Sequence, residues 1–324
     1  MKIVASQTVA DAYGSRIRRL APRAKLIVPS VSDDALIWRG DPTAPDVCCL
    51  SEDMWQDLGQ RRHVLPAMFQ LVGVRWLHTF SAGVDSPAFQ AIIDRGTLLT
   101  NSSGASAPSI AQYVLAMMLA RVKPLDVWRD QQRRHEWLQL APSELTGQTV
   151  AIIGTGAIGG EVARLAQAFR MRVIGIRRSE KQTRYVDEQM PLRRLAPALR
   201  QADFVVVACP LTRETEGLIG EPELRAMKPS ATLINIARGR VVQEDVLVRA
   251  LQEGWIAAAC LDVFAQEPLP ASSPLWDLPN VILTPHNSGP SPLNMERAMA
   301  IFLDNLARFV SGRKLRNLVV ATTG

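Results

Sequence analysis

The sequence is poor in the residues from which disulfide frameworks and metal sites are built. Its 324 residues include only four cysteines and four histidines. The cysteines lack the Cys-x-x-Cys spacing of zinc sites and stand in apolar stretches, so we expect reduced core thiols of a cytoplasmic protein and no bound metal. They are Cys48, Cys49, Cys209 and Cys260.

The sequence also lacks membrane and leader features. No apolar run reaches the roughly 18 residues of a membrane-spanning helix, and the opening MKIVASQTVADAYGSRIRRL turns charged too soon for the core of a signal peptide. The net charge of +6 is modest, and its lysines and arginines are scattered, whereas a nucleic-acid-binding face clusters such residues. We therefore expect no membrane and no nucleic-acid partner, and a small anionic ligand suits the charge.

The first hundred residues alternate short apolar strands with helical segments, a pattern that predicts an open, parallel α/β sheet. A chain of this length, with 47% hydrophobic residues, can form two domains that each have their own core. Strands are expected at MKIVAS, AKLIV, DVCCLS, VRWLHTF and GTLLTN, and a helix is expected at SPAFQAIIDR.

The rest of the chain repeats this pattern after an apolar helix. The helix, from Pro108 to Val122, is so apolar that it must be buried, between domains or against another subunit. We predict an α/β fold of two Rossmann-like, doubly wound parallel-sheet domains with a cleft between them, residues 1–101 with 288–324 and residues 102–287. The later strands are TVAIIG, RVIGI, DFVVVAC, ATLINIA, IAAACLDVF and VILTPH, and SPLNMERAMAIFLDNLARFVSG is a closing amphipathic helix.

The run AIIGTGAIGG fits the pattern Gly-x-Gly-x-x-Gly, with the strand before it and the helix after it that a dinucleotide-binding turn requires. Gly154 permits a tight turn, Gly156 lets the backbone approach a pyrophosphate, and Gly159 lets the helix pack on the strand. The first amides of that helix, at Ala157 and Ile158, would point toward the phosphates. The run therefore predicts a dinucleotide site.

The second strand of this domain does not end in the expected acid. An acid about twenty residues after the glycine turn would bind the ribose hydroxyls, but the strand ends in Arg177 and Arg178, followed by Ser179. Forked, permanently charged donors suit the 2′-phosphate of NADP. A solvated strand end is the alternative interpretation. We therefore expect NADP(H) as the preferred cofactor, with NAD(H) possible.

Three further polar side chains follow or terminate apolar strands of the same domain. They are Arg238 in LINIARGRVV, Glu267 in LDVFAQEPLP and His286 in VILTPHNSG. Taken singly, these are a strand-end arginine, a loop acid and a turn histidine. Ligands of open α/β sheets bind at the carboxyl ends of strands, so the three side chains are expected to converge there.

Several of these motifs, in their order and spacing, resemble the D-isomer-specific 2-hydroxyacid dehydrogenase family, most closely its glyoxylate/hydroxypyruvate reductase branch. They are GTGAIGG, PLTRETEGLIG, MKPSATLINIARG, LDVFAQEPLP and TPH, together with WLHTFSAGVD, LLTNSSGASAPSIAQYVLAMML and ASSPLWDLPNV. The resemblance covers most of the chain except roughly the first seventy residues and the last few. It implies a flavodoxin-like substrate domain, a Rossmann domain, and a homodimer with Pro108–Val122 at the interface.

The resemblance implies reduction of a small 2-ketoacid to the D-2-hydroxyacid by hydride transfer from NADPH. Arg238 would bind the substrate carboxylate and polarise its carbonyl. His286 would donate the proton, and Glu267 would hydrogen-bond the other ring nitrogen. The amides of Ala82 and Gly83 would hold the carboxylate. Further matches to cofactor contacts, besides Arg238 and His286, are Cys209, Pro210, Thr215, Ile236, Ala237 and Asp262.

Two alternatives stay open. The substrate is a bulkier 2-ketoacid if Trp76, Phe80 and Trp276 form a larger pocket. A dinucleotide-sensing regulator, like the corepressors that share this fold, is disfavoured because all three catalytic side chains are present. His78, beside the substrate loop, is a minor candidate for the pocket. His63 and His135 are expected on the surface.

The sequence departs from the family pattern at two positions and differs from two related groups. Gln112 replaces a glutamate common in the interdomain helix, and Asn287 replaces an apolar residue after the histidine. Glu267, where formate dehydrogenases carry glutamine, disfavours that group. We expect no regulatory C-terminal domain after Gly324, which argues against the extended phosphoglycerate dehydrogenases.

Overall fold

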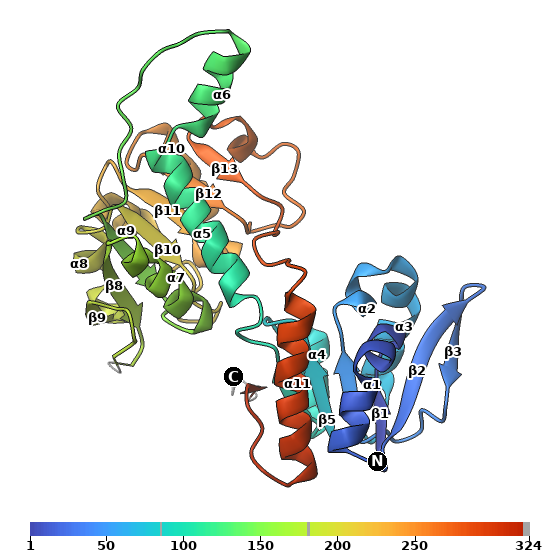
Figure 1. Cartoon of the computed structure of the whole chain (residues 1–324). Coiled ribbons are helices and arrows are strands. Elements are labelled where there is room, and N and C mark those ends of the chain that lie inside the picture. Colours follow the sequence, from blue (N-terminus) through green and yellow to red (C-terminus); the bar gives the residue numbers. More distant parts are fainter. Residues whose placement is uncertain (85, 180–181, 320–324) are drawn as a thin grey trace. The chain divides into compact units, whose positions relative to one another are not determined.

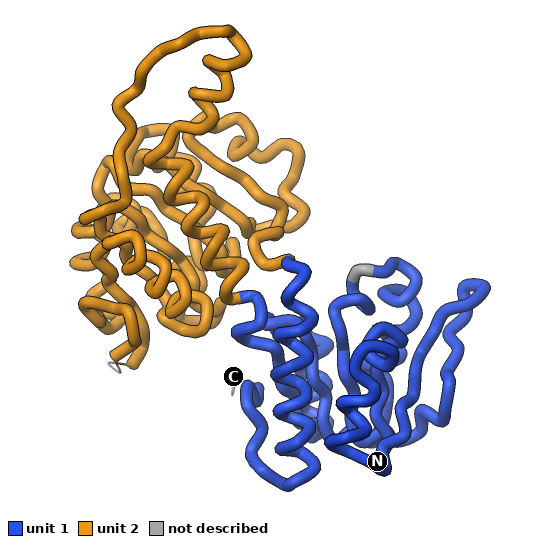
Figure 2. The backbone as a smooth tube through the Cα atoms, in the orientation of Figure 1, with its two compact units in different colours: residues 1–106, 291–324 blue, residues 107–290 orange. Residues whose placement is uncertain are grey.

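The computed structural model describes residues 1–84, 86–179 and 182–319, and it divides the chain into two compact units (Figure 2). Unit 1 consists of Met1–Ser106 and Ser291–Gly324, and unit 2 of Ala107–Pro290. The predicted limits, 101/102 and 287/288, precede these borders by a few residues. As limits of folding domains they stay a prediction.

Over its described residues, unit 1 forms a seven-stranded sheet in the order β14-β6-β5-β4-β1-β2-β3. Figure 1 labels β5, β1, β2 and β3 of this sheet. The inner strands are parallel, and their order β2-β1-β4-β5-β6 is that of flavodoxin-like sheets. The edge strands β3 and β14 are antiparallel to their neighbours. The strands are β1 (Lys2–Val4), β2 (Lys25–Ser32), β3 (Ala35–Arg39), β4 (Val47–Leu50), β5 (Trp76–Thr79), β6 (Leu98–Asn101) and β14 (Leu318–Val319).

Neither antiparallel edge strand was among the strands expected from the sequence. Strand β3 follows β2 through a two-residue turn, because Ser32 lies opposite Ala35 in the register. The turn residues Asp33 and Asp34 both have positive φ, 48° and 58°, as a tight hairpin turn requires. Two successive aspartates are a weaker signal for this turn than Asn-Gly, and the hairpin was therefore missed.

Helices cover both faces of the unit 1 sheet. Alternate residues of β4 enter different cores: Val47 and Cys49 pack with α1 and α11, whereas Cys48 and Leu50 pack with α3 and α4. Burial on both faces explains the continuous apolar run of this strand. The helices are α1 (Gln7–Leu20), α2 (Asp53–Gln56), α3 (Leu58–Gln70), α4 (Pro87–Asp94) and α11 (Asn294–Val310).

Unit 2 contains, over its described residues, a seven-stranded sheet in which every neighbouring pair is parallel. The order β13-β12-β11-β10-β7-β8-β9 places the chain reversal of a Rossmann sheet between β7 and β10. The strands are β7 (Thr149–Ile153), β8 (Arg172–Arg177), β9 (Glu188–Pro191), β10 (Phe204–Val207), β11 (Thr232–Asn235), β12 (Ala258–Leu261) and β13 (Val281–Leu283).

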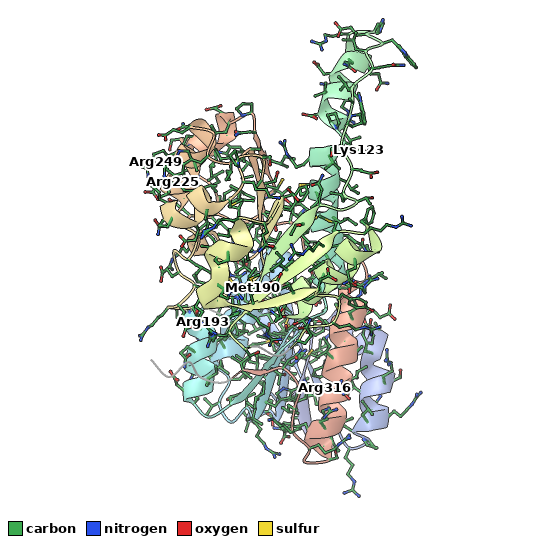
Figure 3. The ribbon with its side chains drawn as sticks, turned by 90° about the vertical axis from the view of Figure 1, so that its left-hand side faces the viewer. Lys123, Met190, Arg193, Arg225, Arg249 and Arg316 are labelled. Carbon is green, nitrogen blue, oxygen red and sulfur yellow. The ribbon has the colours of Figure 1, made fainter. Side chains whose placement is uncertain are left out.

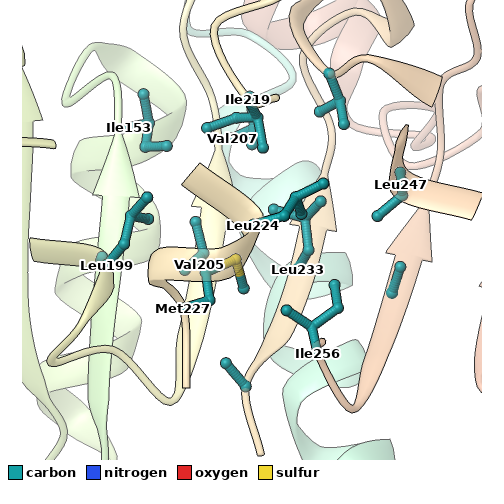
Figure 4. Close-up of a cluster of buried hydrophobic side chains, with 14 of the residues drawn as sticks. Ile153, Leu199, Val205, Val207, Ile219, Leu224, Met227, Leu233, Leu247 and Ile256 are labelled. Carbon is teal, nitrogen blue, oxygen red and sulfur yellow. The ribbon is translucent and has the colours of Figure 1, made fainter. Parts of the chain in front are cut away.

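The central strands of unit 2, β7, β10, β11 and β12, are mostly apolar because both faces of the sheet are buried there, whereas the edge strand β9 contains Glu188 and Gln189. Val205 and Val207 of β10 enter one core cluster, shown in Figure 4, and Phe204 and Val206 enter the other. This alternation is the two-residue period of a strand. The apolar runs of the sequence therefore become the central strands that support the carboxyl edge of the sheet.

Helices α7 to α10 of unit 2 connect its parallel strands, and α5 and α6 precede the first of them. Helix α5, the apolar helix of the sequence, packs against α7, and α9 packs against α10. Arg225 of α9 and Arg249 of α10 lie next to each other (Figure 3). Both guanidinium groups lie over the ring of Trp255 and bond Glu221. The helices are α5 (Ala107–Val122), α6 (Leu125–Arg133), α7 (Ala157–Ala168), α8 (Leu195–Leu199), α9 (Glu221–Ala226) and α10 (Glu244–Gln252), with 3-10 turns η1 (Leu192–Arg194), η2 (Gly239–Val241) and η3 (Pro274–Asp277).

The four cysteines are free and buried, and burial raises the pKa of Cys48 and Cys260 to about 12. Within the described residues, no cluster of three or more His, Cys, Asp or Glu side chains is arranged to hold a metal ion. In the same part of the chain, no helix has the length and apolarity needed to cross a membrane.

Candidate active site

The glycine turn between β7 and α7 is the first part of the candidate site. A Cβ on Gly154, whose φ is 98°, would lie 2.6 Å from the backbone nitrogen of Cys209, and a Cβ on Gly159 would lie 2.0 Å from the Gly154 carbonyl oxygen. A Cβ on Gly156 would meet nothing within 4 Å. Packing therefore explains two of the glycines, whereas the open space at Gly156 suits the close approach of a pyrophosphate.

Helix α7 begins directly after this turn, at Ala157, with Gly156 as its N-cap. The first amides of an α-helix have no acceptor inside the helix, and the helix dipole gives this end partial positive charge. Because the turn follows the carboxyl end of β7, beside the β7–β10 pair at which the strand order reverses, it has the geometry of a dinucleotide phosphate site. Ala157 and Ile158 are the first two residues of this helix, and the contact of their amides with a phosphate stays a prediction.

The end of β8 carries two guanidinium groups. Arg177 is partly buried and donates to the Thr183 hydroxyl at 3.4 Å, and that hydroxyl lies 3.0 Å from the Thr155 hydroxyl. Arg178 is exposed, with its Nε 3.2 Å from a carboxylate oxygen of Glu214. Ser179 is exposed beside it. This strand end therefore presents positive charge to solvent, partly neutralised by Glu214.

The segment after β10 closes over the glycine turn. The Thr215 hydroxyl donates to the Pro210 carbonyl at 2.6 Å and accepts from the Thr212 amide at 2.8 Å, which fixes the loop. Cys209 is buried against Gly154, and burial raises the pKa of its thiol to about 11. Cys209 is therefore a packing residue with a protonated thiol.

The loop that carries Arg238 follows β11. Ile236 and Ala237 are buried, and the partly buried Arg238 donates through Nη1 to the Ala237 carbonyl at 2.8 Å. Next along the chain, a Cβ on Gly239 would lie 1.8 Å from the backbone carbonyl carbon of Phe264. The Arg238 loop therefore packs directly against the backbone that leads to Glu267.

Glu267 and His286 form a hydrogen-bonded pair. One carboxylate oxygen of Glu267 accepts from the Phe264 amide at 3.0 Å, and the other lies 2.8 Å from Nδ1 of His286. An ionised carboxylate only accepts, so this contact assigns a proton to Nδ1. The opposite ring nitrogen, Nε2, is then the atom at which a proton can be exchanged. The side chain of His286 is half exposed.

Asp262 lies beneath the turn that carries His286. It is almost fully buried, and its carboxylate accepts from the Thr284 hydroxyl at 2.5 Å, the Asn287 amide at 2.7 Å and the Ser288 amide at 3.1 Å. The family resemblance assigned Asp262 to the cofactor contacts, but Thr284 was not identified. The order Thr-Pro-His directly after an apolar strand is the sequence feature that could have identified it. Asn287 is exposed and takes part through its amide.

Two aromatic candidates of unit 1 are core residues. His78 is fully buried between the hydroxyls of Thr100 and Ser102, at 2.7 and 3.0 Å, and burial lowers its pKa to about 3. Trp76 is fully buried and stacks on Phe302. The suggestions that His78 or Trp76 line a pocket are therefore wrong, because the period of β5 points both into the core.

The other aromatic and histidine candidates differ in exposure. Phe80 is nearly buried, and Trp276 is half exposed with its indole donating to the Pro270 carbonyl at 2.9 Å. His63 lies 2.8 Å from Asp34, and His135 is exposed. These histidines lie at the surface, as expected.

The loop after β5 carries the predicted substrate amides of Ala82 and Gly83. Its carbonyl groups make internal bonds: Asn101 donates to Ala82 and Ser81 donates to Gly83, both at 2.7 Å. Ala82 is exposed and Gly83 partly so. Asp85, the last residue of the SAGVD motif, lies outside the described residues.

The sequence is similar to proteins of known family. Residues 115–288 match the family model described as "D-isomer specific 2-hydroxyacid dehydrogenase, NAD binding domain". A glyoxylate reductase of Korarchaeum cryptofilum is 37% identical over 255 residues, which cover 76% of each chain. Glyoxylate/hydroxypyruvate reductase B of Pectobacterium atrosepticum is 38% identical over 255 residues, covering 76% of this chain and 79% of that one.

The fold is similar to that of a solved D-isomer-specific 2-hydroxyacid dehydrogenase from Xanthobacter autotrophicus, in complex with NADPH and MES. The TM-score is 0.78 at 27% identity, covering 98% of this chain and 97% of that one. The family model spans more than half of the chain, and its range contains the glycine turn, Arg238, Glu267 and His286. The chain therefore belongs to the D-isomer-specific 2-hydroxyacid dehydrogenase family and is an NAD(P)-dependent enzyme.

Proposed function

We propose that this enzyme reduces a small 2-ketoacid of the glyoxylate or hydroxypyruvate type to the D-2-hydroxyacid, with NADPH as the preferred cofactor and His286 as the proton donor. The observation that carries the proposal is the Glu267–His286 pair, joined at 2.8 Å in the unit that holds the glycine turn. The glyoxylate and hydroxypyruvate reductases among its relatives support the substrate class.

The proposed chemistry adds a hydride to the carbonyl carbon and a proton to the carbonyl oxygen. Bound NADPH supplies the hydride. Arg238 holds the substrate carboxylate with two forked donors and polarises the carbonyl. His286 gives the proton from Nε2, while Glu267 holds Nδ1–H and stabilises the charged imidazolium that precedes the transfer.

The substrate carboxylate is proposed to bind also the amides of Ala82 and Gly83. The carbonyl groups of both residues are used by internal bonds, which holds the loop in a defined shape. Backbone amides in such a loop donate to carboxylates without adding side-chain bulk. Binding by backbone amides in this way is compatible with a small ketoacid as the substrate.

The preference for NADPH is proposed from the end of β8. Arg177 and Arg178 provide two guanidinium groups where an acid would repel a 2′-phosphate, and Ser179 adds a hydroxyl. The similar Xanthobacter enzyme was solved with NADPH. Arg178 is paired with Glu214, so this ion pair would have to break before the guanidinium could bind the 2′-phosphate.

Turnover with a panel of ketoacids and both cofactors tests the proposal. We expect the highest kcat/KM with glyoxylate or hydroxypyruvate and NADPH, and lower values with pyruvate, phenylpyruvate or NADH. A maximum with phenylpyruvate would favour the bulkier substrate class. Tight NADPH binding without oxidation by any ketoacid would contradict the enzymatic proposal and favour a dinucleotide-sensing regulator.

Replacing Arg178 by glutamine is expected to weaken NADPH binding about 10-fold, the effect of roughly 1.4 kcal/mol for one partly exposed charged hydrogen bond. The dissociation constant for NADH should change less than 2-fold, because NADH has no 2′-phosphate. Arg172→Gln, at the opposite end of β8, is the matched control. Equal weakening of both cofactors would contradict a 2′-phosphate contact.

We also propose that the protein is a homodimer. Helix α5 uses one face to pack on α7, and the chain beyond it exposes several large apolar side chains. Exposed apolar side chains of this kind mark interaction surfaces. They are Leu125, Val127, Trp137, Leu138 and Leu140. A molar mass in solution equal to that of one chain would contradict this proposal.

A further inference from the structure

A chain of hydroxyl groups leads from α5 to the turn that holds His286. The Tyr113 hydroxyl lies 2.9 Å from the Thr284 hydroxyl, which lies 2.5 Å from the Asp262 carboxylate. An ionised carboxylate can only accept, so Thr284 donates its single proton to Asp262. Tyr113 must then be the donor to Thr284. The three groups form a directed chain that ends on Asp262.

The carboxylate of Asp262 binds a residue that precedes His286 in the sequence and residues that follow it. Besides Thr284, which precedes the histidine, it binds the amides of Asn287 and Ser288, which follow it. The carbonyl group of Asp262 accepts from the His286 amide at 2.8 Å. His286 has a φ of 51°, a left-handed conformation that is uncommon for residues other than glycine, and the contacts of this turn help to keep it.

We propose that Tyr113 is a positioning residue for ketoacid reduction. Its hydroxyl, acting through Thr284 and Asp262, holds the turn in the conformation that directs the imidazole of His286 toward Glu267. The inference rests on the proposed function, because it takes the proton transfer by His286 as given.

The surroundings of Tyr113 indicate that its hydroxyl, rather than its ring, has this role. The other partly buried α5 residues of the same core cluster are aliphatic or methionine, so the surroundings are apolar and accept the ring of phenylalanine. Burial raises the pKa of Tyr113 to about 12, so the phenol keeps its proton at neutral pH. Tyr113 is therefore a neutral hydrogen-bond donor at neutral pH.

A second side chain of α5 holds the far end of the same turn. The Ser109 hydroxyl lies 3.3 Å from the carbonyl oxygens of both Ser288 and Pro290. Tyr113 and Ser109 are four residues apart, which places both on one face of the helix. This face of α5 therefore supports the His286 turn at two points.

Tyr113→Phe tests the proposal. We expect kcat for glyoxylate reduction by NADPH to fall about 3- to 10-fold, the scale of one neutral hydrogen bond. The KM for glyoxylate, the dissociation constant for NADPH and the melting temperature should stay near the wild-type values. Tyr13→Phe, on α1 of unit 1, controls for the loss of a phenol hydroxyl elsewhere.

Changes at Thr284 separate positioning from general support. Thr284→Val should reproduce the loss in kcat, whereas Thr284→Ser, which keeps the hydroxyl, should retain most of the activity. Because Tyr113 acts through Thr284, Tyr113→Phe should have no further effect in the Thr284→Val background.

Three results would overturn the inference. They are an unchanged kcat in Tyr113→Phe, a loss of kcat that follows a loss of cofactor binding or melting temperature, and additive losses in the double variant. After any of these results, two controls show which proposal is wrong. If the wild-type protein oxidises NADPH with glyoxylate and His286→Gln does not, the proposed function stands and only the role of Tyr113 is wrong. If the wild-type protein does not oxidise NADPH with glyoxylate, the proposed function is wrong.

Discussion

Replacing His286 by glutamine is expected to lower kcat for ketoacid reduction by about 10²- to 10⁴-fold, the usual contribution of a positioned general acid. Glutamine can still hydrogen-bond but cannot supply a proton at neutral pH. Cofactor binding should stay near normal, because the glycine turn and the end of β8 are untouched. Steady-state oxidation of NADPH with glyoxylate, and titration of NADPH fluorescence, measure the two effects.

His135→Gln provides a matched control for this change. His135 is exposed and, like His286, has a positive φ, 56° against 51°. The two substitutions therefore meet a similar positive φ, and strain that this φ causes in glutamine appears in both. If His286→Gln retains full kcat, or loses no more activity than His135→Gln, the proton-donor assignment is wrong.

Gly239→Ala is expected to have the second large effect. Its Cβ would lie 1.8 Å from the Phe264 carbonyl carbon, so the Arg238 loop and the Phe264–Glu267 segment would have to separate. Overpacking of this kind destabilises a protein by about 1–3 kcal/mol or more. Because Arg238 and Glu267 would shift relative to each other, we expect kcat to fall at least about 10²-fold, as displacement by roughly 1 Å does. Thermal unfolding and turnover measure the two effects.

Gly160→Ala is the corresponding control. A Cβ on Gly160 would meet nothing within 4 Å, and the position lies inside α7, where alanine is the better helix former. We expect an unchanged or slightly higher melting temperature and wild-type turnover. Wild-type stability of Gly239→Ala would show that the two loops do not pack as closely as the structure has them.

Much of unit 2 was predictable because its central strands are buried on both faces. Such strands are continuous apolar runs, and the polar residue that follows each run lies at the carboxyl edge of the sheet. Arg177, Arg238 and His286 were found in this way. The contact between Glu267 and His286 was implied by the family resemblance, and the structure places the two groups 2.8 Å apart. Their catalytic roles stay proposals.

Other features were not predictable from local pattern. The three glycines of the turn look alike in sequence, yet only Gly154 and Gly159 are required by packing, because their Cβ atoms would meet backbone atoms. His78 stands beside the substrate loop in the sequence, but its strand turns it into the core. Tyr113 appears in sequence as one more apolar residue of α5.

The sequence by itself determined the fold class, the family, and which strand ends carry charged groups, since apolar periodicity and short motifs are local properties of the chain. Only the tertiary structure decided which of these groups meet. Contacts such as Gly239 with Phe264 and Tyr113 with Thr284 join residues far apart in the chain. They depend on the packing of loops and helices around the sheet, which no local pattern encodes.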